Sequence, residues 1–410
     1  MFPGGLSIAE EEERAVVEAA RSVVRSKQLS RSVSVTGNPF MRPRVAELER
    51  RFAARMQVSH ALAVNSGTSA LMCALASLGI GPGDEVIVPA YTWFSTATSV
   101  LAVGAVPVVG EVDASLTLDP VDLEHRISPY TRAVIAVHMR GAPADMDALG
   151  RVCGAHDLRL IEDVAQAVGG SFRGAPLGTL GDLGTYSFEM SKLITAGEGG
   201  MVVTGNPALH RVASMYHDSA AAPRLGIRSQ DWLAGMNLRM SELQAAVLLA
   251  QLERLDALIG RMRAHKRDLE SVIRERLETR GARFRADHDV SGDVGLASIF
   301  FLEDPAKVPA LVRRLQDENV PASRLFHDLA HVPQDIVDLH AFPAWTPLIE
   351  KRSWSISGEP WRSHPRAVEY GPDSVLQTVD LLRRAVQIDV SPALERKHIR
   401  QMGQAILQAI

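Results

Sequence analysis

The stretch YSFEMSKLITAGEGG, residues 186–200, joins a strand-like run to a glycine-rich turn. Its lysine, Lys192, is the only one between Lys27 and Lys266 in a chain that otherwise prefers arginine. Lysine can lose its proton when it is desolvated or lies near another cation, and the neutral amine then attacks carbonyl carbons, which arginine cannot do. The alternative is a surface lysine on a loop after a strand. The isolation of Lys192 favours a chemical role.

Short strand-like runs alternate with helical patterns around this stretch. The helical patterns include residues 69–78 and 145–156. Strands that are buried on both faces and joined by crossover helices are typical of a mainly parallel sheet. The expected strands cover residues 61–65, 85–90, 106–112, 132–138, 159–163 and 200–205. We therefore expect an α/β fold with a mainly parallel central sheet flanked by helices.

The later part of the chain has a different pattern. An amphipathic pattern begins at Met240 and continues to about Leu277, which is too long for one ordinary globular helix without a bend. A strand-like run at 298–303 and further helical patterns then predict a smaller α+β domain. We divide the chain into residues 1–258, with an N-terminal segment and a large domain, and residues 259–410, with a linking helix and the smaller domain.

Composition excludes several classes of function. The chain has 410 residues, is 46% hydrophobic and carries a net charge of −4 without a basic face, so we expect no nucleic-acid partner. Polar residues, glycine and proline interrupt the longest apolar stretch, 94–110, which argues against a membrane span. The two cysteines, Cys73 and Cys153, lie far apart in apolar segments, so neither a disulfide nor a thiolate metal site is expected. We expect a cytoplasmic protein that acts on small molecules.

Three further signals lie where strands are expected to end. Asp163 closes one strand, at the edge where α/β folds place ligands; it can also cap a helix. The run SGTS (66–69) follows a strand and opens a helix, an arrangement that binds phosphate. Trp93 lies just beyond another strand and can stack on an aromatic cofactor, although a lone tryptophan is more often a core residue. Together with Lys192, these are the groups that pyridoxal 5′-phosphate requires.

The order and wording of several motifs resemble the DegT/DnrJ/EryC1/StrS aminotransferases. That family modifies keto-sugars and keto-cyclitols on the fold-type I pyridoxal phosphate scaffold. The matching stretches are NSGTSAL (65–71), VPAYTWFSTA (88–97), PADMDAL (143–149), IEDVAQAVG (161–169), YSFEMSKLITAGEGG (186–200) and GMNLRMSELQAAVLLAQLERLD (235–256). The stretch TVDLLRRAVQIDVSP (378–392) is similar to the branch that acts on cyclitol ketones such as scyllo-inosose and its 2-deoxy analogue.

The resemblance implies roles for four residues around the cofactor ring. Lys192 would form a Schiff base with the cofactor and later move a proton between the substrate carbon and the cofactor carbon. Asp163 would keep the ring nitrogen protonated by charge pairing. Gln166 would form a hydrogen bond near the phenolic oxygen, and Trp93 would stack on the ring.

The resemblance also implies how the phosphate is held. Gly67, Thr68 and Ser187 would bind it, together with Asn237 of the partner subunit. The expected assembly is therefore a homodimer with shared active sites.

Two stretches depart from the family pattern. Where many members have histidine followed by Leu-Tyr-Gly, this chain has His138-Met139-Arg140-Gly141, and the loop 327–333 lacks the usual tyrosine-rich substrate segment. In that loop His327 and His331 are four residues apart, but no glutamate follows His327, so we expect no metal site. A dehydratase branch replaces the lysine with histidine, so Lys192 favours amino transfer.

The prediction is an aminotransferase that moves an amino group from L-glutamine or L-glutamate to a ketone on a cyclitol or a nucleotide-linked sugar, in secondary metabolism such as antibiotic biosynthesis. One alternative keeps the cofactor but performs dehydration or other carbon chemistry. Another is a non-catalytic regulatory protein that binds the cofactor. The sequence leaves open the ketone, the donor, the stereochemistry and the pathway.

Overall fold

The computed structural model of the chain describes residues 8–26, 43–327 and 338–409. Its central sheet contains β1 (His60–Val64), β2 (Glu85–Pro89), β3 (Val106–Gly110), β4 (Thr131–Val137), β5 (Arg159–Asp163), β8 (Leu183–Ser187) and β9 (Gly200–Thr204). The strand order is β1-β9-β8-β5-β4-β2-β3. The neighbours from β8 to β3 pair in parallel, whereas β9 is antiparallel to both β8 and β1. The predicted mainly parallel sheet is confirmed.

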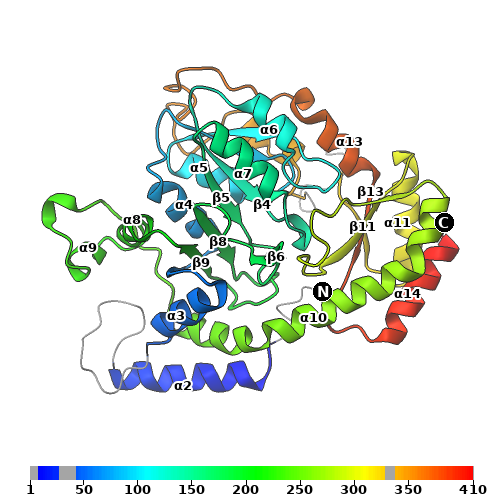
Figure 1. Cartoon of the computed structure of the whole chain (residues 1–410), viewed down its shortest axis with the longest axis horizontal. Coiled ribbons are helices and arrows are strands. Elements are labelled where there is room, and N and C mark those ends of the chain that lie inside the picture. Colours follow the sequence, from blue (N-terminus) through cyan, green and yellow to red (C-terminus); the bar gives the residue numbers. More distant parts are fainter. Residues whose placement is uncertain (1–7, 27–42, 328–337, 410) are drawn as a thin grey trace.

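Helices pack around this sheet and connect its strands (Figure 1). They are α3 (Arg44–Met56), α4 (Gly67–Ser77), α5 (Ser95–Ala102), α6 (Pro120–Arg126), α7 (Met146–Ala155) and α8 (Pro207–His217). Local capping explains where several begin: the Asp145 side chain, for example, accepts a hydrogen bond from Ala148 N at 3.0 Å at the start of α7. Strands β2 and β3 are buried at every position, as expected of strands covered on both faces.

Two helices far apart in the sequence lie side by side at one edge of the molecule (Figure 1). Helix α2 (Glu10–Ser26) packs against the long helix α10 (Glu242–Thr279). The buried Glu12 forms an ion pair there with Arg254, and Ala19 is also buried. The N-terminal helix is therefore attached to the body of the protein by both a charged and an apolar contact.

Helix α10 connects the large sheet to a smaller one. It is continuous over 38 residues and starts with a capping box between Ser241 and Gln244. Figure 1 shows the helix changing direction along its length, as the sequence pattern predicted. Its residues up to Met262 belong to the core of the large sheet, and Leu269, Ile273 and Leu277 belong to a second core. The expected boundary at residue 258 lies inside this helix, and the division into two domains stays a prediction.

The smaller sheet is antiparallel, in the order β10-β11-β13-β12. Its strands are β10 (Arg283–Phe284), β11 (Ala297–Phe301), β12 (Ala322–Arg324) and β13 (Ala385–Asp389), and its helices are α11 (Val308–Asp317), α13 (Leu376–Arg384) and α14 (Arg396–Ala409). Short elements complete the described chain: β6 (Ser171–Phe172), β7 (Ala175–Pro176), α9 (Ala221–Arg224) and α12 (Thr346–Ile349). Among the described residues, every helix is too short or too polar to span a bilayer.

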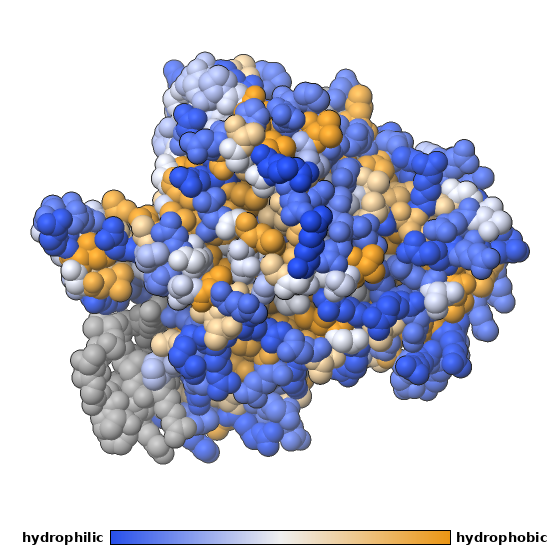
Figure 2. Space-filling view, viewed as in Figure 1, coloured by the Kyte–Doolittle hydropathy of each residue, from blue (hydrophilic) through white to orange (hydrophobic). Residues whose placement is uncertain are grey.

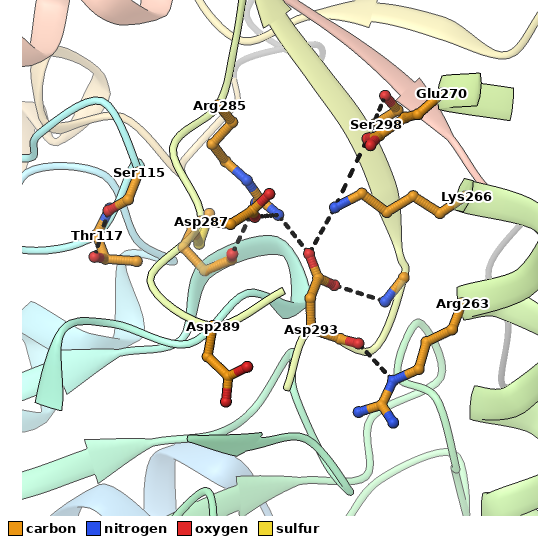
Figure 3. A network of polar contacts seen from close by, with 12 residues as sticks. Ser115, Thr117, Arg263, Lys266, Glu270, Arg285, Asp287, Asp289, Asp293 and Ser298 are labelled. Carbon is orange, nitrogen blue, oxygen red and sulfur yellow. Dashed lines mark hydrogen bonds and ion pairs between the residues drawn. The ribbon is translucent and has the colours of Figure 1, made fainter. Parts of the chain in front are cut away.

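A buried aspartate joins α10 to the loop before β11 (Figure 3). Asp293 Oδ2 accepts hydrogen bonds from Lys266 Nζ at 2.7 Å and Arg285 Nη2 at 2.8 Å, and Oδ1 accepts one from Gly295 N at 2.6 Å. Arg285 Nη1 also donates to the Met139 carbonyl at 3.3 Å, in the turn after β4. The cluster therefore holds the small sheet, the long helix and the large sheet together.

We predict that Asp293→Ala lowers the free energy of unfolding by about 3 kcal/mol, because Lys266 and Arg285 lose the carboxylate between them. Burial alone would raise the pKa of Asp293, but the charges of Arg285 and Lys266 hold it below its usual value. The stabilisation is therefore complete above about pH 4 and is lost as the pH falls further. Urea unfolding of both proteins at several pH values measures this difference.

The matched control is Asp380→Ala, which removes a largely exposed carboxylate paired only with Arg384 on the same helix. It should change the free energy of unfolding by less than about 1 kcal/mol. Equal effects of the two substitutions at neutral pH would contradict the proposed role of Asp293.

Candidate active site

The loop that carries Lys192 joins β8 to β9 and is held at both ends. Phe188 N donates to Gly199 O at 2.8 Å, which closes the loop on itself. Thr195 N donates to Gln251 Oε1 at 2.7 Å, which attaches the loop to α10. The lysine therefore sits on irregular backbone whose position is determined by the sheet and by the long helix.

Lys192 is not a surface lysine. Its side chain is 17% exposed, and Leu193 beside it is buried, although Met190 on the other side is exposed. Burial lowers the pKa of Lys192 from its ordinary value, and the charge of Glu189, 3.9 Å from the amine, opposes part of that shift. The amine is therefore neutral at lower pH than that of an exposed lysine.

Asp163 lies at the carboxyl end of β5 and is buried. Its Oδ2 accepts a hydrogen bond from Thr96 Oγ1 at 3.1 Å, and its Oδ1 accepts one from Ala165 N at 3.0 Å. Burial raises the pKa of Asp163, while these two hydrogen bonds and the charge of Lys192 act against that shift. The chain continues in turns and not in a helix, so the helix-cap alternative is wrong.

The three residues expected to hold a phosphate within one chain lie together. Helix α4 begins at Gly67, and its cap, Ser66 Oγ, accepts a hydrogen bond from Ser69 N at 3.1 Å. The N–H groups of Gly67 and Thr68 have no acceptor within the helix and are free for an anion. A Cβ at position 67 would lie 2.7 Å from Ser187 Cβ, so only glycine allows this approach. These residues fit a bound phosphate group.

A cavity of about 1010 Å³ lies where the large and small sheets meet. Lys192 and Gln166 line it from the large sheet, as does Arg140. Asp389 and His398 line it from the small-sheet side. The cavity is therefore completed by parts of the chain that are far apart in the sequence.

Gln166 and Trp93 meet residues that the motifs did not indicate. Gln166 Oε1 accepts a hydrogen bond from Arg140 N at 3.0 Å, and its Nε2 lies 3.4 Å from His340 Nε2. The Trp93 ring is 44% exposed and lies 4.9 Å from the ring of His340, which in turn contacts Asp338. Trp93 is therefore not a core residue; its stacking on a cofactor stays a prediction.

Sequence reasoning missed three residues of this site. Thr96, which contacts Asp163, lies within the matched stretch 88–97. The motif could therefore have indicated Thr96 as a residue of the site. Arg140 lies in the run that departs from the family pattern. His340 belongs to no matched motif, and no signal in the sequence indicates it.

Asn237 is exposed and does not line the cavity of its own chain. It pairs with Asp218 in an isolated bridge, on the projecting arm between α8 and α10. Figures 1 and 2 show this arm and its apolar surface. The exposed apolar residues there are Leu225, Trp232, Leu233 and Met236. Its role in a partner subunit stays a prediction.

The structure describes both cysteines and most of the possible metal ligands of the chain. Among the residues that it describes, no group of three or more His, Cys, Asp or Glu side chains could hold a metal ion. His331, from the histidine pair considered above, lies outside the described residues. Cys73 and Cys153 are both buried and unpaired, and burial raises the pKa of the Cys153 thiol to about 12.

Comparison with known proteins gives a consistent result. The chain is 44% identical over 230 residues to an L-glutamine:2-deoxy-scyllo-inosose aminotransferase of Micromonospora echinospora. This match covers 53% of this chain and 55% of the relative. It is also 44% identical over 215 residues to a GDP-perosamine synthase of Caulobacter vibrioides. That match covers 52% of this chain and 57% of the relative. The chain thus spans a little over half the length of these curated relatives.

The fold comparison extends over the whole chain. The crystal structure of 3-amino-5-hydroxybenzoic acid synthase matches with a TM-score of 0.79 at 29% identity, over 100% of this chain and 98% of that one. A sequence profile of the DegT/DnrJ/EryC1/StrS aminotransferase family matches residues 23–342. With most of its length matched, the chain belongs to the DegT/DnrJ/EryC1/StrS family of pyridoxal phosphate-dependent aminotransferases.

Proposed function

We propose that the protein transfers an amino group from L-glutamine or L-glutamate to a ketone on a cyclitol or a nucleotide-linked sugar, with pyridoxal phosphate as cofactor. The observation that carries this proposal is the largely enclosed side chain of Lys192, which lines the cavity and interacts electrostatically with the buried carboxylate of Asp163. One relative is named for 2-deoxy-scyllo-inosose and another for GDP-perosamine, so both ketone classes stay in the proposal.

The residues of the site are suited to hold the cofactor. Pyridoxal phosphate, when bound, supplies a carbonyl group that takes the amine and a ring that stabilises the charge left when a substrate proton is removed. The free N–H groups of Gly67 and Thr68, together with Ser187, would bind its phosphate. Asp163 would accept a hydrogen bond from its ring nitrogen.

Two side chains of the protein control the protons in this mechanism. The cationic ring nitrogen would lower the pKa of Asp163 again, so that the carboxylate is charged and keeps that nitrogen protonated. Thr96 orients the carboxylate through its hydrogen bond. Lys192 accepts a proton from the substrate carbon as a neutral amine, since burial lowers its pKa.

The assembly we propose is a homodimer that shares its active sites. The projecting arm exposes apolar side chains next to Asn237, and such surface is usually covered by a partner. In this arrangement Asn237 of the partner subunit completes the phosphate site. The expectation of a cytoplasmic enzyme also belongs to this proposal.

Lys192→Ala should abolish amino transfer, with a rate at least about 1000-fold lower, because the base that moves the proton is removed. It should also remove the yellow colour of the purified protein, since no covalent bond to the cofactor can form. Absorbance spectra and a coupled transamination assay measure both. Lys307→Ala, which changes an exposed lysine, is the control and should match the wild type. A Lys192→Ala protein with wild-type turnover would refute the assignment.

A substrate panel separates the proposed reaction from its rivals. Keto-cyclitols, including 2-deoxy-scyllo-inosose, and nucleotide-linked keto-sugars are incubated with L-glutamine or L-glutamate, and the products are identified by mass spectrometry. We expect an amine product with at least one ketone class. A dehydrated product would support the same fold with different chemistry. A cofactor spectrum that responds to no donor would support a regulatory protein.

Asn237→Ala should weaken cofactor binding about tenfold while the dimer persists, because one hydrogen bond to the phosphate is lost. Fluorescence titration of the cofactor-free protein and sedimentation velocity measure the two properties. Gln230→Ala, on the same arm, serves as the control. A wild-type protein that sediments as a monomer would contradict the shared site.

A further inference from the structure

Arg140 brings a positive charge into the cavity, and no described carboxylate pairs with it. Its Nε donates to the Tyr91 hydroxyl at 3.0 Å, and its guanidinium carbon lies 5.9 Å from the centre of the Tyr91 ring. Within the described residues, no aspartate or glutamate forms an ion pair with Arg140, and its two terminal nitrogens have no hydrogen-bond acceptor. A guanidinium is always charged, and an unpaired charge away from bulk water is costly.

Burial opposes the charge of Arg140, whereas Tyr91, Asp338 and Asp389 favour it, although neither acid forms an ion pair with the guanidinium. Asp338 contacts His340, and Asp389 accepts a hydrogen bond from Gln387 at 2.6 Å. Among the described residues that line the cavity, Arg140 and Lys192 are the only arginine and lysine. In the proposed function, Lys192 bonds to the cofactor and acts as a neutral amine. Arg140 is then the cavity side chain that keeps a positive charge throughout the reaction.

The backbone at Arg140 is strained and tightly supported. Its φ of 53° is left-handed, which is uncommon for a side chain of this size. At the next residue, Gly141, a Cβ would lie 2.6 Å from Val294 Cγ2. Val294 N donates to Gly141 O at 3.1 Å, and Arg285, held by the cluster in Figure 3, donates to Met139 O. The small-sheet side of the molecule therefore positions the turn that presents Arg140.

We propose that Arg140 binds the α-carboxylate of the amino-acid donor, an inference that rests on the proposed function. The two terminal nitrogens of a guanidinium match the two oxygens of a carboxylate. In an α-amino acid, the carboxylate and the amine are on the same carbon. A donor whose amine reaches the cofactor carbonyl beside Lys192 would therefore place its carboxylate inside the cavity that Arg140 lines.

The same charge distinguishes the two substrates that share the cavity. In both ketone classes the reacting carbon carries no carboxylate, because the phosphate charges of a nucleotide-linked sugar are attached elsewhere on the molecule. We therefore expect Arg140 to contribute to the donor step and not to the ketone step. Specificity for a carboxylated donor thus comes from one half-buried positive charge in the cavity, with which the donor's carboxylate would pair.

The test compares the two half-reactions of the cofactor-loaded enzyme by stopped-flow absorbance. Arg140→Gln should lower kcat/KM for L-glutamine and L-glutamate about 100-fold, while the reverse step with the amine product changes less than about threefold. Arg140→Lys keeps the charge but not the paired geometry and should lose less. Arg313→Gln, at an exposed arginine, is the control. Equal losses in both steps, or a loss confined to the ketone step, would overturn the inference.

A binding measurement separates this inference from the proposed function. Glutarate has a carboxylate but no amine, so calorimetry reports its binding without turnover. We expect wild type and Arg313→Gln to bind it, and Arg140→Gln to bind it about 100-fold more weakly. This result without any amino transfer would mean that the carboxylate site stands and the proposed function fails. Equal binding by wild type and Arg140→Gln, or no binding by either, would overturn the carboxylate site.

Discussion

Parallel strands that end at one edge of a sheet bring residues from distant parts of the sequence to the same side of that sheet. Strand β5 ends at Asp163, β8 leads into the loop of Lys192, and β1 leads to Gly67. The core strands are buried on both faces, so their ends cannot move without exposing apolar surface. Any chemistry that the site performs depends on this rigid edge.

The second constraint is the contact between the two sheets. The carboxylate of Asp293 joins α10 to the loop before β11, and Arg285 extends that contact to the turn after β4. The same turn presents Arg140 to the cavity. A buried ion cluster outside the cavity therefore supports the turn that places Arg140 in the cavity lining.

The motifs located the residues proposed to hold the cofactor better than the residue proposed to bind the substrate. Lys192, Asp163 and the run at Gly67 each combine a reactive or anion-binding group with a strand end, and this combination is visible locally. The sequence also showed that Arg140 differs from the residue that many family members have at this position. It did not show what Arg140 contacts or which function it has. His340 had no signal in the sequence, because its place in the site depends on contacts in space with residues such as Trp93, Gln166 and Asp338.

The sequence by itself determined the alternation of strands and helices, the mainly parallel sheet and the choice of Lys192 as the candidate reactive amine. These follow from short-range patterns, since burial on two faces and helix capping are local properties. Only the tertiary structure decided that Arg140 forms no ion pair with a carboxylate among the described residues and that both sheets line one cavity. Gln166 and His340, 174 positions apart, show the reason: charge pairing and cavity shape depend on distances in space that chain order does not encode.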